Sequence, residues 1–465
     1  MDKTKKRKIF SVIGKIIIIL VFAIITITTA KAHEPWSDEA QSFLIAKDSS
    51  FKEIFTQAKY EGTTPLWFLI IKFFLLIGGS YETFFILPIF FSILGVIILE
   101  FKVKAPWYIK LLLPFTYFIL FQYSVVARSY CMLFPALMWI ASVYRDRGEH
   151  LISYCLALLF LMSICSFSMV IASSLFLIDI IKIWKEKVCT KRNIIFCVII
   201  ALGLLGTFLI ILPAKDCSFT PGSSSSIFHV VYQATVGSQK DSLLASILVT
   251  LVVLCTIIAA IFKEKDRKWK AINLLILFIP VSAEVLLIAP QIWHIGNIAL
   301  LILTAFIING MIINNRIIQI FILVVCTFQI GWSAVSVCYE LNNNYSGSKD
   351  SAEFIKQNHY EDRIIYGLGF DITALQPYFD RNIFKNQNTA KRYWLWKKDN
   401  GYIQDDTLVD LDDDAIFVIS GINLESFRNI YDKLKEKGYQ EYYFSGQMFA
   451  KTYICEPKDY YILTK

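Results

Sequence analysis

Long apolar stretches alternate with short polar segments over roughly the first 340 residues of the chain. Eleven of them have the composition of membrane-spanning helices, and they lie near residues 9–30, 84–99, 110–126, 129–144, 151–165, 169–184, 194–212, 242–262, 271–289, 296–312 and 317–336. A helix needs about 20 apolar residues to cross the hydrocarbon core of a bilayer, and most of these stretches approach that length. The pattern predicts a polytopic α-helical membrane protein with about eleven transmembrane helices.

One further apolar segment, "TPLWFLIIKFFLLIGG" at residues 64–79, does not fit this series, because it is short and is interrupted by Lys72. Counting it as a span would move every later basic loop to the side opposite the basic N-terminus. We therefore expect an interfacial or re-entrant helix on the outer face of the membrane. Residues 31–83 then form one large first outer loop.

The pattern changes after the last apolar stretch. The segment "NNNYSGSKD" is typical of a polar linker. Beyond it, "SAEFIKQN" and "NLESFRNIYDKLKEKG" have helical periodicity, whereas "RIIYGLG", "AIFVIS", "QEYYFS" and "YYILTK" are typical of strands. The sequence thus predicts a transmembrane domain at residues 1–340 and a soluble α/β domain at 341–465.

Charge sets the expected orientation of the protein. The N-terminus and the loops "KVK", "RDRGE", "KIWKEKVCTKR", "KEKDRKWK" and "NNR" carry an excess of Lys and Arg, as cytoplasmic loops do. This places the C-terminal domain outside a cell membrane. The net charge of +8 is distributed over these loops and therefore does not indicate a nucleic-acid partner. A cleaved signal peptide is the alternative for the first stretch, because "TTAKA" follows it.

The ten cysteines lie mostly inside apolar stretches and show neither CxxC nor zinc-type spacing. They indicate no disulfide framework and no metal site. Cys217, Cys338 and Cys455 fall outside the predicted spans, where a bridge stays open as an alternative.

Several polar residues are predicted at the outer edge of the membrane. They are Asp38 and Glu39 in "HEPWSDEAQSF", Glu61 in "YEGTTPLW", Arg128 in "ARSY" and His294 in "QIWHIGN". Each has an ordinary explanation: a solvated loop, a snorkelling anchor at the headgroups, or an interfacial belt residue. Their shared depth is the stronger signal, since polar groups near the membrane are costly unless they serve a cavity.

A sixth residue, Glu284, lies inside an apolar span below His294. An intramembrane carboxylate usually faces a polar interior, so we expect it to contribute to substrate binding. Such a set of groups suits group transfer from a phosphate. A carboxylate can take the proton of an acceptor hydroxyl, while a guanidinium and an imidazole hold the leaving phosphate.

The motifs resemble those of GT-C glycosyltransferases that use polyprenyl-phosphate sugars, in particular the protein O-mannosyltransferase and aminoarabinose-transferase group. The resemblance rests on the acidic pair in "SDEA", the acidic residue before a Pro-Leu turn in "YEGTTPLW", and the Arg-x-Tyr element in "ARSY". It covers residues 1–340 in organisation. It implies a GT-C-like catalytic domain and a lipid-phosphate sugar as donor, with Tyr130 in the donor site.

When the functional residues of the family are matched to this sequence position by position, the resemblance implies that Asp38 is the general base and that Glu39 orients the loop or the acceptor. Glu61 matches the second acidic position, Arg128 helps to bind the donor phosphate, and His294 resembles a histidine of bacterial relatives. Asp38, Arg128 and His294 are then expected to open into a common hollow at the non-cytoplasmic membrane surface, large enough for a sugar and its phosphate.

The sequence departs from the family where relatives carry His-Pro-Pro or Lys-Pro-Pro and this chain has Thr63-Thr64-Pro65. A metal or phosphate contact made there is in doubt. We expect no cofactor and no obligatory divalent metal.

The predicted function is transfer of a sugar, with inversion, from a polyprenyl-phosphate donor to an extracytoplasmic cell-wall polymer, glycolipid or protein. The alternatives are a transporter or flippase of lipid-linked saccharide, and a non-catalytic envelope-assembly protein. A transporter more often shows internal repeats. The aromatic stretch "KRYWLWKKDNGY" at 391–402 is expected either to capture the acceptor or to rest on the membrane or the other domain.

Overall fold

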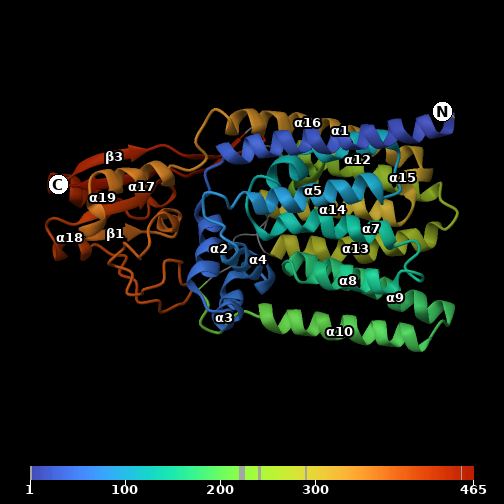
Figure 1. Cartoon of the computed structure of the whole chain (residues 1–465), viewed down its shortest axis with the longest axis horizontal. Coiled ribbons are helices and arrows are strands. Elements are labelled where there is room, and N and C mark those ends of the chain that lie inside the picture. Colours follow the sequence, from blue (N-terminus) through green and yellow to red (C-terminus); the bar gives the residue numbers. More distant parts are fainter. Residues whose placement is uncertain (1–2, 219–225, 239–241, 288–290, 452) are drawn as a thin grey trace.

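The computed structural model describes residues 3–218, 226–238, 242–287, 291–451 and 453–465. A bundle of long helices lies at one end and a domain with strands at the other (Figure 1). Between them lie three short helices of the first outer loop, namely α2 (Ser37–Asp48), α3 (Phe51–Glu61) and α4 (Pro65–Leu76). The last two residues of the predicted stretch 271–289 lie outside the described residues.

The bundle contains ten helices of eleven or more residues within the described part of the chain. They are α1 (Lys3–Ala32), α5 (Ile86–Phe101), α7 (Leu133–Val143), α8 (Leu151–Met162), α9 (Ser166–Glu186), α10 (Lys191–Ile211), α12 (Leu243–Phe262), α13 (Arg267–Leu287), α14 (Ile292–Ile308) and α16 (Arg316–Glu340). Shorter helices are α6 (Trp107–Leu112), α11 (Ile227–Thr235) and α15 (Met311–Asn314). By length and composition, 6 of the described helices could each cross a membrane alone.

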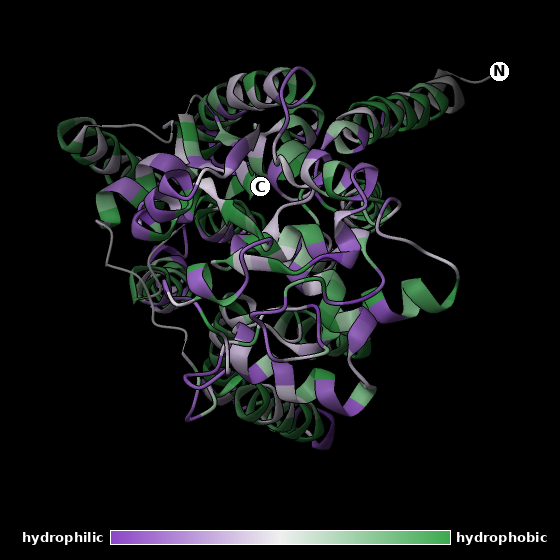
Figure 2. Ribbon diagram, turned by 90° about the vertical axis from the view of Figure 1, so that its left-hand side faces the viewer, coloured by the Kyte–Doolittle hydropathy of each residue, from purple (hydrophilic) through white to green (hydrophobic). Residues whose placement is uncertain are grey.

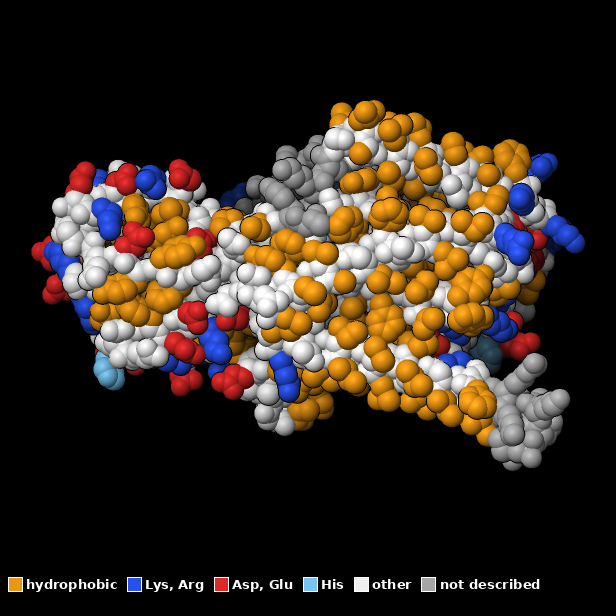
Figure 3. Space-filling view, turned by 90° about the horizontal axis from the view of Figure 1, so that it is seen from above, with side chains coloured by type: hydrophobic (Ala, Val, Ile, Leu, Met, Phe, Trp, Pro, Cys, Tyr) orange, Lys and Arg blue, Asp and Glu red, His pale blue; other side chains and the backbone are white. Residues whose placement is uncertain are grey.

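The side of the bundle is covered by hydrophobic side chains, and charged side chains gather at its two ends (Figure 3). Large exposed residues such as Leu202, Val252 and Ile279 belong to this belt. Seen from the end that carries the strand-containing domain, hydrophobic helices lie around and behind more polar segments (Figure 2). A continuous apolar belt of this kind is stable only in lipid, so the protein is a multi-pass membrane protein. Lys and Arg cluster at the end of the bundle remote from the strand domain.

The predicted span 110–126 is not one helix, which corrects the sequence-based expectation. It consists of the end of α6, a 3-10 turn η1 (Leu113–Phe115) and a π-helical turn η2 (Phe118–Gln122). Pro114 lacks the N–H that would continue α6. Thr116 has extended backbone, with ψ of 152°, and so separates the two turns.

The helix predicted near the outer face forms as α4. The Lys72 ammonium, which interrupts its apolar sequence, donates hydrogen bonds to the carbonyl oxygens of Ala46 at 3.0 Å and Ser49 at 2.6 Å. These carbonyls lie at the C-terminal end of α2, where a cation is favoured by the helix dipole. Lys72 therefore fixes α4 against α2.

The C-terminal domain, called the outer domain after its predicted side of the membrane, is an α/β unit, as the sequence predicts. Its elements are α17 (Ser348–Gln357), β1 (Ile365–Leu368), η5 (Asp371–Tyr378), α18 (Leu408–Leu411), β2 (Ile416–Ser420), α19 (Arg428–Glu436), β3 (Gln440–Phe444), β4 (Gln447–Ala450), β5 (Tyr453–Pro457) and β6 (Tyr460–Thr464). The main sheet has the order β1-β2-β6-β3, in which β1 and β2 are parallel and the other pairs antiparallel. The β4–β5 hairpin was not predicted from the sequence.

The connection between the two parts is packed rather than extended in solvent. Tyr345, in the segment expected to be a polar linker, is buried, and its ring lies 4.6 Å from the ring of His33. Lys451, in the turn of the hairpin, is also buried. Its ammonium donates to the carbonyl oxygens of Gln233 at 2.6 Å and Gly237 at 2.8 Å. The outer domain is thus packed against one end of the helix bundle.

Candidate active site

The first turn of α2 presents the acidic pair in two different directions. Asp38 is partly exposed, whereas Glu39 is fully buried. The Glu39 carboxylate accepts a hydrogen bond from the Trp36 N–H at 3.2 Å and so caps the start of the helix. It also accepts one from the Ala127 N–H at 2.5 Å. Acidic side chains in this turn are favoured by the helix dipole.

Asp38 forms an ion pair with Arg128, which precedes the 3-10 turn η3 (Ser129–Met132). The guanidinium donates to the Asp38 carboxylate, and the two side chains are only 23% and 22% exposed. The pair lines a cavity of about 30 Å³, here called the small polar cavity. Its other lining residues are Gln41, Ser42, Glu61, Thr63, Trp67, Phe68, Ser129, Phe370 and Trp396.

Glu61 reaches the same cavity from the end of α3. Gly62, with φ of +61°, ends that helix in the left-handed conformation that glycine adopts readily. The Thr64 hydroxyl then donates to the Ile164 carbonyl at 3.1 Å and pins the turn to the α8–α9 connection. The Gln41 amide donates to the Glu61 carboxyl at 2.7 Å. Burial raises the pKa of Glu61 from 4.5 to about 8.

The outer domain closes the small polar cavity with aromatic side chains. The rings of Phe370 and Trp396 lie 4.8 Å apart, and both residues line the cavity. The backbone N–H of Trp394 donates to the Gln41 side-chain oxygen at 2.8 Å. Part of the aromatic stretch 391–402 therefore rests on the first outer loop, and part forms a wall of the site.

Tyr130, His294 and Glu284 form a neighbouring group. The ring of His294 lies 5.9 Å from that of Tyr130 and 5.0 Å from that of Phe167. Glu284 is hydrogen-bonded to the Ser166 side chain at the start of α9. None of the three predicted residues is among those that line the small polar cavity.

The expected common hollow is therefore not present in this form: Asp38 and Arg128 share a cavity of about 30 Å³, which has the volume of roughly one water molecule rather than of a sugar and its phosphate, and His294 does not line it. Tyr130 connects the two groups, because it follows Arg128 by two residues and contacts His294. Sequence reasoning missed Gln41 and Phe370, and it considered Trp396 only as part of the aromatic stretch 391–402. The spacing of Gln41, three residues after Asp38 on one helix face, was the available signal for one of them.

His33 was also missed. Its two ring nitrogens lie 2.9 Å from the Glu39 carboxylate and 2.8 Å from that of Glu340. Burial alone would lower the pKa of His33, but these two carboxylates raise it to about 10. The position of a histidine directly after a membrane span, in "HEPW", was the signal in the sequence.

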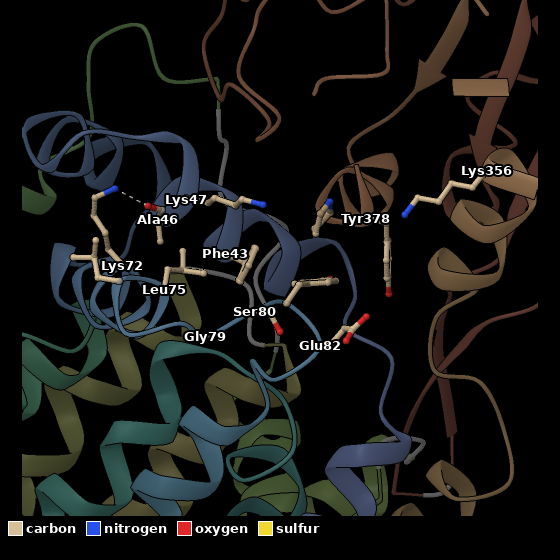
Figure 4. Close-up of a pocket in the computed structure, with 13 residues that line it drawn as sticks. Phe43, Ala46, Lys47, Lys72, Leu75, Gly79, Ser80, Glu82, Lys356 and Tyr378 are labelled. Carbon is tan, nitrogen blue, oxygen red and sulfur yellow. Dashed lines mark hydrogen bonds between the residues drawn. The ribbon is translucent and has the colours of Figure 1, made fainter. Parts of the chain in front are cut away.

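A larger groove lies on the opposite face of α2. It comprises two cavities of about 630 Å³ and about 570 Å³ that share Tyr81, Glu82, Lys356 and Tyr378. Lys47, Lys356 and Glu82 point toward the ring of Tyr378 (Figure 4). Residues 39, 43 and 46 of α2 face the groove, whereas 38, 41 and 42 face the small polar cavity. One helix thus separates two polar spaces.

The ten cysteines, all within the described part of the chain, are free thiols. The pairing left open for Cys217, Cys338 and Cys455 is therefore not formed. Among the described residues, no group of three or more His, Cys, Asp or Glu side chains is arranged to hold a metal ion.

Comparison with known proteins gives one informative result. No family model matches the sequence, and no curated protein matches it. Among solved structures, the apo crystal structure of ArnT from Cupriavidus metallidurans is similar, with a TM-score of 0.50 and 10% sequence identity. The match covers 97% of this chain and 98% of ArnT. The chain therefore has the ArnT-like polytopic membrane fold, of the GT-C type, that its motifs predict.

Proposed function

We propose that the protein is a glycosyltransferase of the outer face of a cell membrane, which moves a sugar from a polyprenyl-phosphate donor to an extracytoplasmic acceptor. The observation that carries the proposal is the Asp38–Arg128 pair in a polar cavity between the bundle and the outer domain. The fold similarity to ArnT supports it. The orientation rests on the basic end of the bundle facing the cytoplasm.

In the proposed reaction, Asp38 accepts the proton of an acceptor hydroxyl. The hydroxyl oxygen attacks the anomeric carbon from the face opposite the phosphate and forms the new glycosidic bond. The bond between that carbon and the phosphate oxygen breaks, and the electron pair leaves with the polyprenyl phosphate. The configuration of the sugar is thereby inverted.

Arg128 has two successive partners in this mechanism. Without donor it is paired with Asp38. A donor phosphate offers the guanidinium a stronger bidentate partner, and the developing negative charge of the leaving group strengthens that contact in the transition state. Transfer of Arg128 to the phosphate frees the Asp38 carboxylate for its role as base.

The remaining predicted residues bind substrate. Glu61 bears a proton at neutral pH, because burial raises its pKa to about 8, and can donate to a sugar hydroxyl. Tyr130 and His294 lie behind Arg128 and would contact the phosphate or the first unit of the carrier, with Glu284 beneath them. Glu39 orients α2. No step requires a metal.

The test uses the whole protein in its own membrane. Cells lacking the protein are complemented with the wild type, with Asp38→Asn, or with the control Asp380→Asn, which changes an exposed carboxylate of the outer domain. Envelope glycans are then compared by mass spectrometry. We expect Asp38→Asn to reduce transfer about 10²–10⁴-fold, because an amide cannot accept the proton. Normal glycans with Asp38→Asn would refute the proposal and favour a transport or assembly role.

A further inference from the structure

The side chain of His33 joins three elements at the outer end of the bundle. It follows the last residue of α1, and its Nε2 lies 2.9 Å from Glu39 in α2. Its Nδ1 lies 2.8 Å from Glu340, the last residue of α16. Burial alone would lower the pKa of His33, but the two carboxylates raise it to about 10, so at neutral pH the ring is an imidazolium, whose two N–H groups donate to Glu39 and Glu340.

The environment makes this charge necessary. The side chains of His33, Glu39 and Glu340 are 2%, 0% and 1% exposed. Buried carboxylates this close to each other would repel or take up protons without a cation between them. Removing one partner of such a buried pair is costly because an uncompensated charge remains.

The same network supports the backbone on both sides of the small polar cavity. Glu39 is the neighbour of Asp38, and its carboxylate accepts the N–H of Ala127, the neighbour of Arg128. A fixed Glu39 carboxylate thus sets the distance between the segment that carries Asp38 and the segment that carries Arg128.

We propose that His33 is a positioning residue of the site, whose contacts with Glu39 and Glu340 hold the Glu39 carboxylate in place so that Asp38 and Arg128 face each other. The proposal rests on the proposed function for its effect on turnover. His33 itself does not line the small polar cavity. Its influence passes through Glu39 and the backbone of Ala127.

The kinetic test is a double-mutant cycle of His33→Gln and Glu340→Gln in the full-length protein in lipid nanodiscs, with a polyprenyl-phosphate hexose as donor and an extract of the native cell envelope as the source of acceptor hydroxyls. The measured quantities are kcat and KM for release of polyprenyl phosphate. We expect His33→Gln to lower kcat about 10–100-fold with little change in KM, because misplacement affects the transition state more than binding.

The decisive result is the double variant. If His33 acts by neutralising two carboxylates, adding Glu340→Gln to His33→Gln removes the repulsion and recovers about tenfold in kcat. The matched control is His150→Gln, which changes an exposed histidine and is expected to leave kcat unchanged. Additive losses in the cycle, or an unchanged kcat in His33→Gln, would overturn the proposal.

Hydrogen exchange separates this inference from the proposed function. The Ala127 amide, bound to Glu39 at 2.5 Å, is expected to exchange slowly in the wild type and at least tenfold faster in His33→Gln, with recovery in the double variant. This readout needs no substrate. Unchanged protection of Ala127 in His33→Gln would refute the positioning role of His33 even in an active transferase. Loss of protection and its recovery in the double variant would support that role even if Asp38→Asn left transfer unchanged.

Discussion

Replacement of Glu61 by glutamine tests whether the carboxyl at the small polar cavity is protonated. Burial raises the pKa of Glu61 from 4.5 to about 8, and its recorded hydrogen-bond donor is the neutral Gln41 amide. Glutamine has the shape of a protonated glutamate and titrates nowhere in this range. The change Glu61→Gln therefore removes the titration while keeping the contact with Gln41.

The sign and size follow from proton linkage. Between pH 4.5 and 8 the folded protein holds a proton on Glu61 that the unfolded chain releases, so the free energy of unfolding falls as pH rises. A difference of one unit between the folded and unfolded pKa values corresponds to about 1.4 kcal/mol in the free energy of unfolding. From pH 5.5 to 7.5 the wild type is expected to lose about 2 kcal/mol through this group, and Glu61→Gln is expected not to lose it.

The assay is thermal unfolding of both proteins in detergent at pH 5.5 and 7.5, followed by tryptophan fluorescence. Glu61→Gln should raise Tm more at pH 7.5 than at pH 5.5. The control is Glu53→Gln on the same helix. The backbone N–H of Ser50 and the Lys391 ammonium lower the pKa of Glu53 to about 2, so it is ionised at both pH values, folded or unfolded. An equal effect of Glu61→Gln at both pH values would refute the argument that Glu61 is held protonated.

Two further predictions concern how the outer domain is attached. Arg392→Met is expected to release the aromatic stretch 391–402 from the first outer loop, because the buried guanidinium pairs with Asp48 and removing one partner of such a pair costs about 3–5 kcal/mol. Unchanged resistance of this stretch to proteases would contradict the prediction. Burial lowers the pKa of Lys451 to about 7, so docking of the β4–β5 hairpin should strengthen as pH rises from 7 toward 10. In Lys451→Met, which loses the bonds to Gln233 and Gly237, the protection factors of the hairpin amides, corrected for the intrinsic pH dependence of exchange, should not rise with pH.

Local chemistry made much of the fold predictable. Apolar length and the placement of Lys and Arg indicated a membrane bundle. Local sequence patterns located six elements of the outer domain, two helices and four strands, to within a few residues. The third predicted span failed because hydropathy does not detect backbone breaks. Pro114 and Thr116 divide that stretch into short turns that remain buried among other helices.

The candidate site was only partly predictable for a related reason. Asp38, Glu61 and Arg128 were identified because charge near a membrane is conspicuous. Gln41 carries no charge, and neutral polar residues are common at membrane surfaces. Trp396 was noted only within an aromatic stretch, because it lines the cavity only together with residues such as Asp38, which lies more than 350 positions earlier in the chain.

By itself, then, the sequence determined that this chain is a polytopic helical membrane protein with a C-terminal α/β domain. Solvation energy is a property of composition and spacing, so it can be evaluated without coordinates. Only the tertiary structure decided which of its charged groups meet: Arg128 with Asp38, His33 between Glu39 and Glu340. Such pairings depend on how distant helices pack, and a shift of one turn would exchange every partner.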